Sequence, residues 1–148
     1  MSELAPPGGG YTNFAQMRVA VGPLAGPTIC RVVSILAGRA HCPLDRLEDV
    51  LLVCDAIIDH APAHVADGHI GLGVGVSRTG IELSLGPLVA SSGESILAGS
   101  AIPGIGNVLT RVADRVAVQP LDGGCERLVL GLDFDATRPS TGPVGLAL

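Results

Sequence analysis

Apolar residues alternate with polar residues or glycines in several short segments, a pattern typical of strands that bury one face. These segments lie near 15–22, 69–77, 80–87, 116–119 and 125–134. A short turn that ends at Gly80 separates the second segment from the third, and a glycine-rich turn at 121–124 joins the last two. Turns of this kind predict hairpins. We therefore expect a mainly antiparallel sheet.

Two amphipathic helices are expected between the first and second strands, because apolar residues recur there every three or four positions. The first begins after Pro27 and ends near Arg39. The second is the clearer: Pro43 suits its first turn, acidic residues follow at the positive end of the helix dipole, and Pro62 limits its end. Its apolar stripe consists of Leu47, Val50, Leu51, Cys54, Ile58 and Ala61.

A third helix is expected after Gly106, with an apolar face that reaches Val116. The preceding segment, residues 88–103, contains small and polar residues without firm periodicity, so we expect a poorly ordered loop there. The alternating glycines in the run from Gly68 to Gly75 are expected to pack closely under a helix.

The resulting order, β-α-α-β-β-α-β-β, predicts an α+β fold. It is a two-layer sandwich, in which a mainly antiparallel sheet has helices on one face. We expect one domain over residues 14–135, with the first strand at an edge of the sheet. Residues 1–13 and 136–148 contain proline, glycine and small polar residues, which predicts a flexible leader and a flexible tail.

Charge and composition narrow the functions that this domain can have. The chain of 148 residues carries 14 acidic and 9 basic residues, a net charge of -5. All nine bases are arginines, so a P-loop lysine and a Schiff-base lysine are both excluded. Few aromatic side chains are present to stack on bases, and we expect no nucleic-acid partner. No apolar run is long enough to span a membrane, so we expect a cytoplasmic protein without a membrane partner.

The four cysteines, Cys30, Cys42, Cys54 and Cys125, form no Cys-x-x-Cys pair. Reduced, partly buried thiols are the expected state. A zinc site that also uses histidines is the alternative, although no pair of histidines has ligand spacing together with a pair of cysteines.

Two short motifs carry the candidate chemistry. Asp55 and Asp59 are four residues apart, so both project from one side of the second helix. They form either a solvated flank or a site for a metal and a reacting group. Gly104, Gly106 and Asn107 precede the third helix, where backbone N–H groups can bind phosphate. A tight loop that enters a helix explains the same glycines.

In this order, the elements and the two motifs resemble the anti-sigma-factor serine kinases of the GHKL group, the histidine-kinase-like ATPases with the Bergerat fold. In that family the helix carries Glu-x-x-x-Asn, in which Glu is the base or positions water and Asn holds Mg²⁺. The resemblance implies that Asp55 is catalytic and that Asp59 is the Mg²⁺ ligand. It implies nucleotide binding by Gly104, Gly106 and Asn107.

The chain departs from the family at the adenine box, an Asp-x-Gly-x-Gly run after the second hairpin strand. The positions of that run are Pro87, Val89 and Ser91. Proline has no side-chain acceptor for the adenine amino group, so we expect ATP binding to be lost or weak and no cofactor to be needed.

The expected function is therefore that of a regulatory protein-interaction domain in transcription control, similar to an anti-sigma factor. Its partner would be a sigma factor, an anti-sigma antagonist or a second copy of the chain. One alternative is an active serine protein kinase that uses Mg-ATP. The other is a small-ligand module that uses the former nucleotide cleft.

Overall fold

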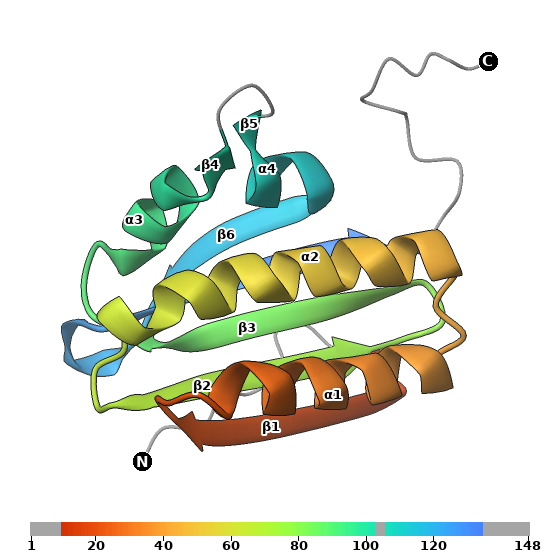
Figure 1. Cartoon of the computed structure of the whole chain (residues 1–148), viewed down its shortest axis with the longest axis horizontal. Helices are drawn as coiled ribbons and strands as arrows, with labels where there is room; N and C mark the ends of the chain where they lie inside the picture. The colour runs from red at the N-terminus through yellow and green to blue at the C-terminus, as the bar shows by residue number, and fades with distance from the viewer. Residues whose placement is uncertain (1–9, 103–105, 135–148) are drawn as a thin grey trace.

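The computed structural model describes residues 10–102 and 106–134 (Figure 1). Its centre is a five-stranded antiparallel sheet with the strand order β1-β2-β3-β7-β6. The strands are β1 (Asn13–Ala20), β2 (His69–Val76), β3 (Gly80–Leu88), β6 (Arg115–Pro120) and β7 (Glu126–Asp133). The first strand lies at one edge, as expected, and the last strand lies inside the sheet.

Helices α1 (Ala25–Arg39) and α2 (Leu44–His60) lie side by side across one face of this sheet (Figure 1). The shorter helices α3 (Ser92–Gly99) and α4 (Val108–Val112) lie on the other side of α2, above β6 and β7. A two-residue pair of strands, β4 (Ala101–Ile102) and β5 (Gly106–Asn107), connects them. The predicted two-layer α+β architecture with a mainly antiparallel sheet is confirmed, but the predicted order of elements lacked α3 and the β4–β5 pair. None of the helices in the described ranges is long and apolar enough to cross a membrane.

The core lies between the helix pair and the sheet, and one side of each strand supplies it. Its largest fully buried side chains include Ile29, Ile57, Ile70, Leu72, Ile81, Leu83, Leu85, Leu128 and Leu130. The apolar stripe of α2 differs from the predicted one. Val53 and Ile57 are fully buried, whereas Leu51 and Ile58 are only half-buried. Ile58 lies beside α1, where a Cβ on Gly26 would be 3.5 Å from it, so the helix turns a slightly different face to the sheet.

Residues 92–99 form helix α3, so the predicted loop over 88–103 is wrong in this part. Ser92 and Ile96, one helical turn apart, are almost completely buried, and Gly93 is buried against β6 and β7. A Cβ on Gly93 would lie 2.6 Å from Val118, so the helix fits only because this position is glycine. Tertiary contacts form this helix where local periodicity was weak.

The helix expected from Gly106 to Val116 is also shorter than predicted. Helix α4 begins at Val108 and ends at Val112, and Val116 belongs to β6. The backbone is already extended at Ala113, because β6 must pair with β7 from Arg115 onward.

The alternating glycines of β2 do not pack under a helix, which corrects that expectation. Their neighbours Leu72 and Val74 point into the core, so Gly73 and Gly75 face the other side of the sheet. There they lie under the stacked rings of Phe14 and Tyr11. Tyr11 belongs to the predicted leader, of which the structure describes residues 10–13. The rest of that leader and the predicted tail lie outside the described residues.

A buried arginine connects three elements at the start of α2. Arg46 donates to the backbone oxygen of Asp133 at 2.9 Å and forms ion pairs with Asp49 at 2.5 Å and Asp114 at 3.0 Å. Asp114 also accepts the backbone N–H of Asp133 at 2.7 Å. The arginine therefore fixes α2 against the end of β7 and the start of β6.

Candidate functional site

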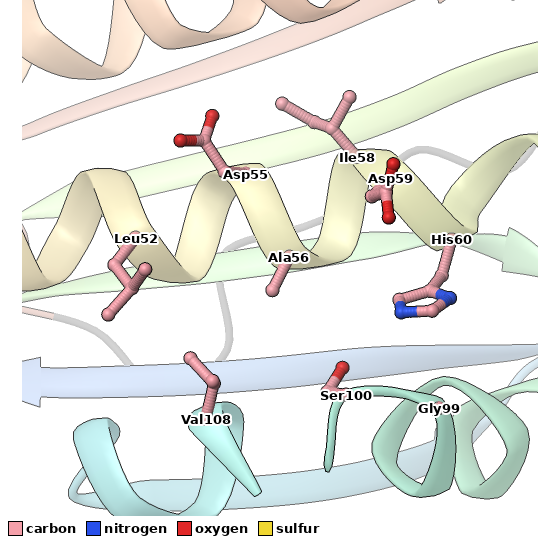
Figure 2. Close-up of a pocket in the computed structure, with 9 residues that line it drawn as sticks. All are labelled: Leu52, Asp55, Ala56, Ile58, Asp59, His60, Gly99, Ser100 and Val108. Carbon is pink, nitrogen blue, oxygen red and sulfur yellow. The ribbon is translucent and has the colours of Figure 1, made fainter. Parts of the chain in front are cut away.

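A groove of about 600 Å³ lies between α2 and the segment that contains α3 and α4 (Figure 2). We refer to this hollow as the α2 groove. The residues that line it are Leu52, Asp55, Ala56, Ile58, Asp59, His60, Gly99, Ser100 and Val108. Both aspartates of the first predicted motif are among them, so the structure brings these two residues to the same hollow.

The lining residues of α2 fall on two sides of the helix. Leu52, Ala56 and His60 are spaced four residues apart and point toward α3 and α4 (Figure 2). Asp55 extends to the opposite side, toward α1, and Asp59 stands on the outward surface between them (Figure 2). The two carboxylates are exposed and therefore flank the groove without forming its floor.

Asp55 has one described partner, the thiol of Cys30 on α1. The Sγ atom donates to Oδ1 of Asp55 at 3.5 Å. Partial burial of the thiol, this hydrogen bond and the negative charge of Asp55 together raise the pKa of Cys30 to about 11. The thiol is thus protonated near neutral pH and holds Asp55 toward α1.

The second predicted motif is only partly within the described chain. Gly104 lies outside the described residues, and Gly106 pairs with Ile102 in the small β4–β5 ladder. The side chain of Asn107 caps α4: its oxygen accepts the N–H groups of Leu109 at 3.0 Å and Thr110 at 3.2 Å. Its amide donates to the backbone oxygen of Leu97. These contacts give Asn107 a structural role between α3 and α4.

Helix α3 has a carboxylate at its N-terminus. Glu126, the first residue of β7, accepts the backbone N–H of Ser91 at 3.2 Å and of Gly93 at 2.6 Å. Negative charge at this end of a helix is favourable because the unpaired N–H groups carry partial positive charge. Ser91 adopts the left-handed backbone conformation, with φ of 68°, and so turns the chain into the helix.

Two histidines near the end of α2 hold the same helix from the other side. A Cβ on Gly99 would lie 3.0 Å from the ring of His60, so the imidazole packs directly on this glycine. Nδ1 of His64 lies 3.2 Å from the hydroxyl oxygen of Ser92. The segment that we expected to be a loop is therefore fixed at both ends.

The residues present do not fit Mg-ATP bound as in GHKL kinases. Pro87 lies in β3 and offers no side-chain acceptor, and the N–H of Val89 donates to the backbone oxygen of His64 at 2.9 Å. Ser91 belongs to the turn that Glu126 holds. The described lining of the groove contains no arginine, and the chain has no lysine, so no permanently cationic side chain lines the groove there to neutralise a triphosphate.

Asp55 and Asp59 are the candidate metal ligands at the groove. Within residues 10–102 and 106–134 there is no group of three or more His, Cys, Asp or Glu side chains placed to hold an ion. Ca²⁺ takes about six to eight oxygen ligands, more than Asp55 and Asp59 supply, whereas Mg²⁺ is usually held by one or two carboxylates together with waters and substrate phosphates. Cys54 is buried in the core and the other three cysteines are free thiols that are partly buried.

Sequence reasoning missed the apolar side of the groove and the cap on α3. The spacing of Leu52, Ala56 and His60 was a usable signal, because residues four apart lie on one helix face. Glu126 had no local signal, since its partners are more than thirty positions earlier in the chain.

No known protein-family model matches this sequence, and the search of curated proteins found no match.

Proposed function

We propose that this chain is a regulatory protein-interaction domain derived from anti-sigma-factor kinases of the GHKL group, in which ATP binding is lost or weak. The order of the elements and the position of Asp55 and Asp59 on α2 support the relationship. The partner class is a sigma factor, an anti-sigma antagonist or a second copy of this chain.

The observation that carries the loss of ATP binding is the packing of α3. The segment that covers the nucleotide in the related ATPases is here a helix fixed by Glu126, His60 and His64. Its N-terminus holds a carboxylate of the same chain, and this negative charge opposes an approaching phosphate. A domain that carries out no reaction on a nucleotide acts by binding other molecules at its surface.

Thermal unfolding with Mg-ATP and Mg-ADP tests the proposed loss. A ligand present at about 100 times its Kd stabilises the native state by about 2.7 kcal/mol, which is easily seen as a shift of Tm. We expect no saturable shift at millimolar nucleotide. A saturable shift that is abolished by Gly104→Ala with Gly106→Ala would favour the serine-kinase alternative.

The interaction itself is tested by purifying the complex. We expect a partner captured from the source cells to form a stoichiometric complex with the pure chain, and apyrase or added ATP should leave its affinity unchanged. A chain that stays alone, or whose complex needs ATP, would contradict the proposal.

The small-ligand alternative is favoured by one observation, the 600 Å³ groove itself, whose volume is within the range of small-molecule sites. Small-molecule screening by ligand-observed NMR distinguishes it, because a true ligand would lose its signal changes when Leu52 or Val108 is replaced by a larger residue that fills the groove.

A further inference from the structure

The outward face of α2 carries a regular row of four acidic residues with one leucine among them. Asp45, Glu48, Leu52, Asp55 and Asp59 follow one another at spacings of three and four residues, so they form one stripe along the helix. All five are exposed, and Leu52 is 45% exposed. We call these five residues the acidic stripe.

The acidic stripe runs beside the α2 groove and shares residues with it. Leu52, Asp55 and Asp59 belong to both. Across the groove Val108 of α4 faces Leu52 and Ala56 (Figure 2). The surface therefore combines an apolar hollow with a row of negative charges along one side.

The negative charges of the stripe have no cationic partner in the described part of the chain. The ion pairs of α2 there are those of Arg46, which uses Asp49 and Asp114. Like charges at spacings of three and four residues, such as Asp55 and Asp59, destabilise a helix. A cationic partner would remove this repulsion.

We propose that the α2 groove and the acidic stripe bind a basic amphipathic helix of a partner protein. This inference rests on the interaction function proposed above. The stripe spans about 20 Å, the length of a helix of about four turns. Arginine or lysine residues on one face of the partner pair with the carboxylates, and an apolar side chain between them enters the hollow beside Leu52. Helix-in-groove recognition uses this division between apolar anchors and a charged rim.

A designed peptide provides the probe. It is a blocked helical peptide of about 18 residues with arginines on one face and a central leucine, labelled for fluorescence anisotropy. The control peptide has the same composition with the arginines and leucine distributed around the helix. We expect the first peptide to bind more tightly, and its affinity to fall as NaCl increases because exposed charges are screened by salt.

Matched variants locate the binding surface. Asp55→Asn should weaken binding roughly two- to fivefold, the range for an exposed ion pair, and Asp122→Asn in the β6–β7 turn should leave it unchanged. Leu52→Ala should weaken binding about tenfold by removing apolar contact area, whereas Leu24→Ala at the start of α1 should have no effect. Equal binding of the two peptides, or equal effects of Asp55→Asn and Asp122→Asn, would overturn the proposal.

Spermidine and Mg²⁺ test whether a small cation is the occupant. If either binds as tightly as the peptide and Leu52→Ala has no effect, the proposed helix is wrong. Binding measurements on the purified complex distinguish a failure of this inference from a failure of the proposed interaction function. If a partner binds Asp55→Asn and the unmodified chain equally, the proposed interaction function holds, but the acidic stripe is not the binding surface. If no stoichiometric complex forms, the proposed interaction function is wrong.

Discussion

At Gly75 one additional carbon atom would force the neighbouring ring of Tyr11 to shift. A Cβ there would lie 2.7 Å from the ring of Tyr11, whose hydroxyl donates to Glu82. We expect Gly75→Ala to lower the free energy of unfolding by about 1–3 kcal/mol, the usual cost of overpacking. Urea unfolding measures the change.

Gly38 is the matched control for this substitution. It lies in α1, and a Cβ added there would have no neighbouring atom within 4 Å beyond the helix's own backbone. Gly38→Ala should therefore stabilise the chain by about 0.5–1 kcal/mol. Equal effects of the two substitutions would contradict the role of the Tyr11 contact.

The Cys30 thiol makes stability depend on pH in the alkaline range. Its pKa is raised to about 11 from an ordinary value of 9.0. The folded state therefore favours the protonated thiol, so this contribution to stability is complete below pH 9 and is lost as the pH rises toward 11. Burial raises the pKa of Cys54 as well, which acts in the same direction.

Urea unfolding between about pH 8 and pH 11 should show a decreasing free energy of unfolding. We expect the decrease to be smaller in Cys30→Ser, because a serine hydroxyl does not ionise in this range. Identical pH profiles of the variant and the unmodified chain would show that folding does not raise the pKa of the Cys30 thiol.

Helix α3 depends on an anchor from a distant strand. Because Glu126 accepts two backbone N–H groups at its start, Glu126→Gln should weaken the local stability of α3 by about 1 kcal/mol. Hydrogen exchange of residues 93–99 should become faster, while exchange within α2 stays unchanged. Asp122→Asn, in the β6–β7 turn, is the control, and equal protection of α3 in both variants would contradict the anchor.

Helix α2 depends on the ion pairs of Arg46. The side chain of Arg46 is 8% exposed and that of Asp114 is 14% exposed. Arg46→Met therefore breaks an ion pair that is largely shielded from water. We expect a loss of about 3–5 kcal/mol in unfolding free energy. Arg18→Met breaks the exposed ion pair with Asp67 and should change the free energy of unfolding by less than about 1 kcal/mol. Chemical unfolding of both variants measures the difference, and similar losses would show that burial does not set the cost.

At the scale of the whole molecule, the sequence predicted those elements whose signal is local. The alternation around Leu72 and Leu83 and the prolines that flank α2 are local signals, and the structure has these strands and this helix. The stretch from Ser92 to Val112 was predicted poorly because its stability comes from remote residues. Glycines at both ends of α3 lower its intrinsic helix propensity, and Glu126 and His60 compensate only after the chain has folded.

The candidate site was predicted to the same extent. Spacing alone placed Asp55 and Asp59 together on α2, and both line the groove. The side of the groove formed by Gly99 and Val108 depends on how α3 and α4 lie against α2, which no local pattern in the sequence specifies.

The position of β7 inside the sheet has a consequence for the synthesis of this protein. The ribosome releases residues 126–133 last among the described strands, yet they pair with both β3 and β6. Until they emerge, β3 presents an unpaired edge to solvent or to a chaperone, and α3 has no anchor. The nascent chain therefore cannot complete its sheet until residues 126–133 have left the ribosome, however early the other strands are translated.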